Sequence, residues 1–162
     1  MEYLAGDIEI TDTDTFLEDL RSIANEHGAV LQALNSAYVA GEKHLARAVS
    51  LSQRSRQRGE AIASDAGLEF LLYAAGTRQI EQALQFGVSE GKQSVVIVIV
   101  GGNETEAAKD VKAVLDPRSE LPAPCVDSIC EWFEITEQER SATTASLEAL
   151  VCERVALLTI NR

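Results

Sequence analysis

Hydrophobic and polar residues are arranged along the chain in patterns that predict both strands and helices. Tyr3 to Ile10 alternates apolar with acidic side chains and predicts a first strand, and Ala29 to Leu34 predicts a second. Gln93 to Val100 is almost wholly apolar and predicts a central strand buried on both faces. The prolines of Asp116 to Pro124 predict a loop.

Helical periodicity accounts for most of the remaining chain. The clearest helix runs from Glu42 to Arg58 and is closed by Gly59. Others are predicted from the Thr11–Thr15 cluster to about Asn25, at 37–39, over 66–86 in two pieces separated by Gly76, and over 104–115, 126–133 and 144–158. The first of these has three possible caps, namely Asp12, Asp14 or a capping box formed by Thr15 and Glu18, and a second capping box joins Thr136 and Glu139.

The predicted elements include many more helices than strands. Their order predicts an α+β fold with a small mixed β-sheet and several helices packed on it, in a single domain over residues 1–162. Leu68 to Ala75 is apolar nearly all round apart from Glu69. Such a helix is either central in its own core, which we expect first, or half covered by a partner.

Charge changes the picture more than any other feature of composition. The 162 residues hold 26 Asp and Glu against 14 Lys and Arg, a net charge of −12, and only four of the basic residues are Lys. An acidic, lysine-poor surface suits a salt-rich cytoplasm, so we expect a halophilic, archaeal source and a cytoplasmic protein without a signal peptide. The negative charge argues against an ordinary nucleic-acid-binding protein, which is usually basic overall.

No constellation of residues typical of catalysis or metal binding is present. His27 and His44 lie far apart and lack metal-ligand spacing, and the three cysteines predict buried, reduced thiols. Gly101 to Asn103, between a predicted strand and helix, could bind an anion through backbone N–H groups, but Glu104 and Glu106 would repel a phosphate. We expect a plain turn, with no catalytic residue, metal or cofactor. A small enzyme that holds a nucleotide at this turn is the alternative.

Positive charge is concentrated on the helix predicted from Glu42 to Arg58. The 17 residues from Lys43 to Gly59 contain five basic residues and no acid, which leaves −17 for the other 145. Four of the five fall within a sector of about 60° on a helix: Lys43, Arg47, Arg54 and Arg58. Two interpretations remain open. The arginines pair with surface acids on a solvated face, or the face contacts the phosphates of a nucleic acid.

Several segments, in their order along the chain, resemble the small accessory subunit of the KEOPS complex, the family of the PRPK-binding protein TPRKB and its archaeal relatives. The main segment reads Glu69-x-x-Leu72-Tyr73-x-x-Gly76-x-Arg78-Gln79-Ile80-x-x-Ala83-Leu84, followed by Gly87-Val88. Earlier segments read Val30-x-Gln32-Ala33-Leu34 and Val39-x-Gly41-x-x-His44-Leu45-x-x-Ala48. The resemblance covers most of the chain and is weakest in the proline-rich loop.

The resemblance implies a non-catalytic subunit that docks on the PRPK-type kinase-like ATPase and supports its activity. KEOPS makes threonylcarbamoyladenosine in tRNA, and in archaeal relatives this subunit also recruits tRNA by its 3′ CCA end. On that basis we expect RNA-binding residues of two kinds. Lys43, Arg47, Arg54 and Arg58 would contact phosphates, and Arg78 and Gln79 would meet single-stranded bases by stacking and hydrogen bonding. The alternative is a protein-only adaptor that binds the kinase-like subunit without contacting RNA.

Overall fold

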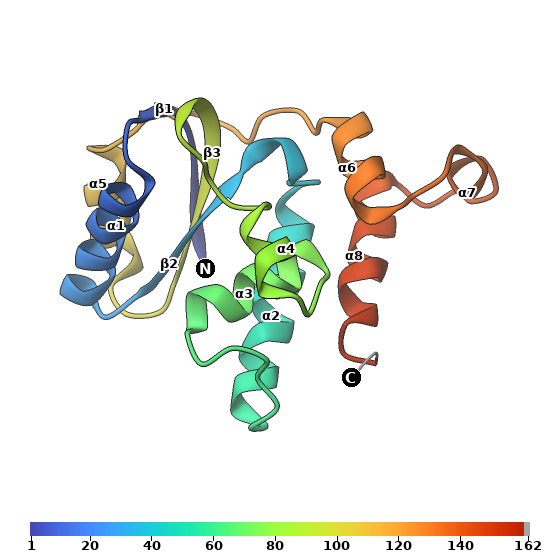
Figure 1. Ribbon diagram of the computed structural model, residues 1–162, viewed down its shortest axis with the longest axis horizontal. Helices are drawn as coiled ribbons and strands as arrows, with labels where there is room; N and C mark the ends of the chain where they lie inside the picture. The colour runs from blue at the N-terminus through green and yellow to red at the C-terminus, as the bar shows by residue number, and fades with distance from the viewer. Residues whose placement is uncertain (161–162) are drawn as a thin grey trace. The chain divides into compact units, whose positions relative to one another are not determined.

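Strands and helices alternate in the first third of the chain, and helices dominate the rest (Figure 1). The computed structural model describes residues 1–160. The elements, in order, are β1 (Glu2–Ile10), α1 (Thr13–His27), β2 (Val30–Asn35), the 3₁₀ turn η1 (Ser36–Tyr38), α2 (Glu42–Gln57), α3 (Ala66–Ala75), α4 (Ile80–Leu84), β3 (Gly91–Val100), α5 (Glu104–Lys112), β4 (Asp116–Arg118), α6 (Val126–Phe133), α7 (Glu137–Ser141) and α8 (Leu147–Leu157). The α+β class is confirmed. No helix among the described residues combines the length and apolar character needed to cross a membrane.

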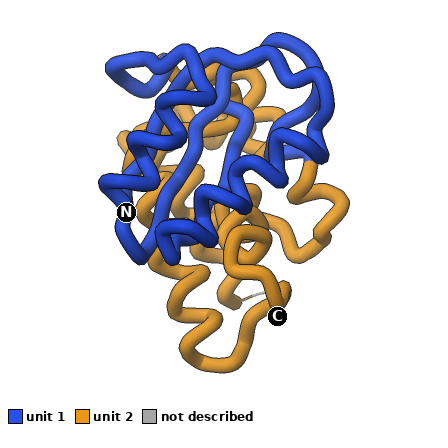
Figure 2. The backbone as a smooth tube through the Cα atoms, turned by 90° about the vertical axis from the view of Figure 1, so that its left-hand side faces the viewer, with its two compact units in different colours: residues 1–36, 85–122 blue, residues 37–84, 123–162 orange. Residues whose placement is uncertain are grey.

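The chain divides into two compact units, shown in different colours in Figure 2. Unit 1 is Met1–Ser36 with Gln85–Pro122, and unit 2 is Ala37–Leu84 with Ala123–Arg162. Unit 1 contains the sheet with α1 and α5, and unit 2 is helical. The expectation of one domain over residues 1–162 stays a prediction.

The sheet of unit 1 has the strand order β2-β3-β1-β4, and every neighbouring pair is antiparallel. It is therefore antiparallel throughout rather than mixed. As predicted, β3 is an inner strand, and Val95 to Ile99 are at most 1% exposed. One face of the sheet packs against α1 and α5 through a single apolar cluster that includes Phe16, Leu20 and Val111.

Helix α1 shows which of the three candidate caps the chain uses. The Asp12 carboxylate accepts a hydrogen bond from the Asp14 N–H, and Thr15 donates its hydroxyl to Asp12 instead of forming a capping box. The helix ends at Gly28, whose φ of 64° is the left-handed conformation that glycine adopts freely.

The prediction of a loop over the whole of Asp116 to Pro124 is wrong at its start, because β4 is a three-residue strand on the edge of the sheet. Pro117 lies opposite Gly6 of β1. An edge strand needs only half of its backbone groups for pairing, so it tolerates a proline. A Cβ atom on Gly6 would lie 2.7 Å from the Asp116 carbonyl oxygen, so only glycine allows this close approach.

Unit 2 is built around α2, α3 and α8, and α3 is its most buried helix. Eight of the ten residues of α3 are buried, so the core interpretation of this apolar segment is confirmed. The helix stops at Gly76, with a φ of 67°, as the sequence predicts. Helix α6 has the predicted bounds, and α8 begins at Leu147, later than expected, because Ser146 caps it. The three cysteines are free, but Cys125 is exposed and Cys130 and Cys152 are only half-buried, so the prediction of buried thiols is wrong for Cys125 and met only in part by the other two.

Candidate nucleic-acid interface on helix α2

Helix α2 has a buried face and an opposite charged face, as its periodicity predicts. Leu45, Ala48, Val49 and Ser52 are buried. Lys43, Arg47, Arg54 and Arg58 are all exposed, and we call these four residues the basic ridge. At ~1.5 Å per residue the ridge is roughly 22 Å long.

The four cations of the basic ridge take part in no ion pair among residues 1–160. Other arginines do: Arg118 pairs with Asp7, and Arg154 pairs with Glu139 at 2.6 Å. The described residues therefore give no support to the interpretation that the ridge arginines pair with surface acids. The charged groups of the ridge are open to an external anion.

Arg56, the fifth basic residue of α2, binds the backbone of its own chain and is not part of the basic ridge. Its Nη1 donates a hydrogen bond to the Ser64 carbonyl oxygen at 2.9 Å, across the loop that follows the helix. Glu69 holds the same loop from the other side. Its carboxylate is fully buried and accepts hydrogen bonds from the Ile62 and Ala63 N–H groups and the Ser55 hydroxyl. The end of α2 that carries Arg54 and Arg58 is thus fixed in place.

The opposite end of α2 is capped by a distant residue. Gly41, at the N-cap position, has no side chain to offer, and the Glu148 carboxylate from α8 accepts the Lys43 N–H at 2.9 Å. A Cβ atom on Gly41 would overlap that carboxylate, so glycine is needed for the approach.

Helix α8 also carries Cys152, whose thiol lies near the ridge. Burial raises the pKa of this thiol and Glu148 adds to the effect, whereas Arg47 and Lys43 act to lower the pKa. Helix α8 therefore lies beside the first half of the ridge.

His44 links α2 to α3 and is not a ligand. Its Nδ1 accepts a hydrogen bond from the Ala40 N–H at 3.1 Å, so the proton resides on Nε2, which donates to the Ala74 carbonyl oxygen at 2.8 Å. The ring also packs edge-on against Phe133. Burial lowers the pKa of His44 to about 4, against a smaller raising effect of the Ala74 carbonyl. The imidazole is therefore neutral at physiological pH.

Arg78 and Gln79 are exposed in the connection between α3 and α4. The bond between His44 and Ala74 joins the beginning of α2 to the end of α3. Arg78 follows Ala74 by four residues in the sequence, so the connection that carries both residues starts near the beginning of α2. Tyr73, the aromatic residue nearest to them in the sequence, is only 2% exposed and cannot stack on a base.

At the turn from Gly101 to Asn103 in unit 1, nearby side chains already accept hydrogen bonds from the backbone N–H groups that an anion would need. The Glu104 carboxylate accepts the Gly101 N–H at 2.7 Å, and the Asn103 side chain accepts the Glu106 N–H and caps α5. A Cβ atom on Gly102 would overlap the His27 carbonyl oxygen, so close packing against the end of α1 is enough to require glycine at this position. These contacts favour the plain turn.

Folding also brings together a group that the sequence gives no sign of. Ligand atoms of Glu26, His27 and Asp110 lie within 4.8 Å of one another at the end of α1. A histidine with two carboxylates is a donor set that suits Zn²⁺. The hydrogen bond between His27 Nε2 and the Asp110 carboxylate, at 2.6 Å, accounts for this geometry without a metal.

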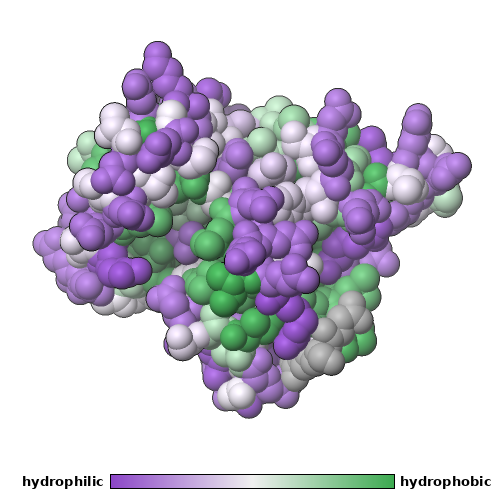
Figure 3. Space-filling model, in the orientation of Figure 1, coloured by the Kyte–Doolittle hydropathy of each residue, from purple (hydrophilic) through white to green (hydrophobic). Residues whose placement is uncertain are grey.

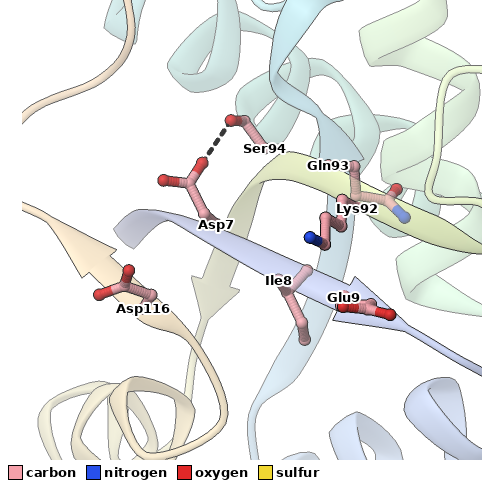
Figure 4. A pocket seen from close by; sticks show the side chains of 7 residues that line it. All are labelled: Asp7, Ile8, Glu9, Lys92, Gln93, Ser94 and Asp116. Carbon is pink, nitrogen blue, oxygen red and sulfur yellow. Dashed lines mark hydrogen bonds between the residues drawn. The ribbon is translucent and has the colours of Figure 1, made fainter.

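A shallow hollow on unit 1 lies over the ends of β1 and β3 (Figure 4). Asp7, Glu9 and Asp116 line it against one cation, Lys92. Hydrogen bonds from Ser94 and Arg118 lower the pKa of Asp7, so this carboxylate stays ionised. A lining with three acids repels a polyanion, which leaves the basic ridge as the candidate nucleic-acid interface.

The fold and the ridge define a class, that of an α+β protein with a cationic helix face on an acidic chain. The family model of the kinase binding protein CGI-121 matches residues 9–159, so the chain belongs to this family of kinase-binding proteins. The resemblance to the KEOPS accessory subunit is confirmed by this match. The search of curated proteins found no match.

Proposed function

We propose that the protein is a non-catalytic, cytoplasmic accessory subunit of KEOPS. It binds and stimulates the PRPK-type kinase-like ATPase of the complex and recruits tRNA through its 3′ CCA end for threonylcarbamoyladenosine modification. Membership of a family of kinase-binding proteins supports the first half of this proposal. The second half is supported by the basic ridge.

The observation that carries tRNA recruitment is a set of four exposed cations, without ion pairs among residues 1–160, on a chain with a net charge of −12. An acidic body repels RNA everywhere except at a local positive potential, so the ridge would set the orientation in which tRNA approaches. Cations that contact phosphates position the RNA without reading its sequence. Arg78 and Gln79 would then meet the unpaired bases, with the guanidinium plane of Arg78 in place of an aromatic ring.

The test reverses two charges in the middle of the ridge. Arg47→Glu with Arg54→Glu changes the net charge from −12 to −16, and so does the matched control, Lys92→Glu with Lys112→Glu in unit 1. In a gel-shift titration with tRNA we expect the ridge variant to lose roughly tenfold or more in affinity. The control should lose far less, because its charges belong to unit 1 and not to the ridge. Both should keep their thermal stability, since exposed charges contribute little to it.

Equal losses in the two variants would mean that only the overall charge matters and would refute the ridge. A protein-only adaptor is the second candidate, and the CCA end separates it from the first. Removing the CCA end of the tRNA should weaken binding of the wild-type chain. The adaptor hypothesis expects no tRNA binding above that of the ridge variant, with or without that end.

A further inference from the structure

Among the large aliphatic side chains of unit 2 that are exposed to solvent, four lie on α4 or at the end of α8, and the fifth, Val126, begins α6. Ile80 and Leu84 of α4 are 45% and 55% exposed, and Leu157 and Ile160 at the end of α8 are 41% and 74% exposed. We call these four residues the apolar patch. Figure 3 shows apolar surface over α4 and near the end of α8.

The two halves of the apolar patch flank the place where the chain that follows α3 approaches α8. A Cβ atom on Gly76 would lie 3.9 Å from the Arg154 carbonyl oxygen, so the connection that leads into α4 packs against α8 one turn before Leu157. Ile80 and Leu84 are four residues apart and share one face of α4, while Ala83 is fully buried and anchors the helix. The short helix α4 thus presents its aliphatic side chains outward on a fixed base.

The chemistry of the patch suits a protein better than RNA. Nucleic acids are bound by cations and by planar groups that stack on bases, and the four side chains are neither. A protein interface has an apolar centre and a polar rim. Exposed acidic residues next to the patch supply such a rim: Glu81 on α4 and Glu153 on α8.

We propose that the apolar patch is the surface on which the kinase docks, an inference that rests on the proposed function for the identity of that kinase. The family is one of kinase-binding proteins, and a second copy of this chain is a poor occupant, because each copy carries a charge of −12 and two copies repel. The matching face of the kinase would be apolar at its centre and basic around it.

The experiment measures the affinity of the full chain for the PRPK-type kinase-like ATPase of the same organism by calorimetry. Ile80→Asp with Leu84→Asp should weaken binding at least tenfold. The matched control, Leu17→Asp with Val114→Asp, replaces two similarly exposed aliphatic residues of unit 1 and adds the same charge, so its affinity should stay within about twofold of wild type. Ile160→Asp is a third variant, chosen because its side chain is the most exposed of the four and its loss disturbs no packing.

The outcomes separate the patch from the proposed function. If the wild-type chain binds the kinase and both patch variants bind equally well, the patch assignment is overturned and the accessory role stands. If the wild-type chain does not bind the kinase at all, the proposed function fails with it. A wild-type dimer that Leu84→Asp dissociates, or a loss of tRNA binding with kinase binding intact, would assign the patch to another occupant and overturn the inference.

Discussion

Two fully buried polar side chains of unit 2, His44 and Glu69, illustrate how a titratable residue can serve packing alone. Each lies in a segment that resembles the family signature, and each has its polar atoms paired within the chain. A buried polar group without a partner costs free energy, so such residues hold backbone groups that would otherwise be left unpaired. His44 joins two helices, and Glu69 orders the loop after α2.

The pKa of His44 makes stability depend on pH. Its pKa is about 4 in the folded state and 6.5 without the fold, so the unfolded chain binds more protons between these values. Stability should therefore fall as pH decreases from 6.5 to 4, by about 3 kcal/mol for this residue. Urea unfolding of the wild type and of His44→Gln across this range checks it. The variant starts less stable and should lack this part of the pH dependence, and parallel curves for the two proteins would contradict the assignment.

Glu69→Ala should destabilise the protein by about 3 kcal/mol or more, because two backbone N–H groups and the Ser55 hydroxyl lose their acceptor. We also expect faster proteolysis in the loop at residues 59–65. The control is Glu81→Ala, which removes an exposed carboxylate and should change the free energy of unfolding by less than about 0.5 kcal/mol. Equal stability of the two variants would show that the buried carboxylate is dispensable.

At the scale of elements, α8 holds α2 through Glu148 and Gly41. Gly41→Ala should displace the Glu148 carboxylate and cost about 2 kcal/mol, and Glu148→Ala should cost about 1 kcal/mol through loss of the cap. Because both changes disrupt the same contact, the double variant should lose clearly less than the sum of the two. A double-mutant cycle by chemical denaturation measures this coupling, and strict additivity would rule it out.

Short sequence patterns predicted those features that depend on neighbouring residues alone, namely the faces and the ends of helices. The period of α2 gives its buried and exposed faces, and glycines with positive φ end α1 and α3 where the sequence places them. The sequence does not reveal β4, because a strand containing Pro117 forms only where an edge and Gly6 accept it. The cap of α2 was equally hidden, since Lys43 and Glu148 are 105 residues apart. Such contacts depend on tertiary packing, which no window of sequence contains.

At the scale of the whole molecule, the candidate site was predictable to the extent that charge alone defines it. A run of cations in an acidic chain is enough to identify the basic ridge from the sequence. The apolar patch could not be found in this way, because Ile80 and Leu84 have the pattern of core residues and only the fold leaves them exposed. The two surfaces differ in chemistry, one cationic and the other aliphatic, and salt should weaken binding at the first far more than at the second.

Salt titrations of the two interactions test this difference. Each phosphate neutralised on a single strand contributes about −0.7 to the slope of log affinity against log salt, so four ridge contacts predict a slope of about −3 for tRNA. Arg47→Ala with Arg54→Ala leaves two contacts and should reduce the slope to about −1.4. Affinity for the kinase should change little with salt or rise, because added salt screens charge but not apolar burial, and kosmotropic salts strengthen it. A tRNA slope that the double variant leaves unchanged would show that other residues bind the phosphates, and a steep fall in kinase affinity would show that docking is electrostatic.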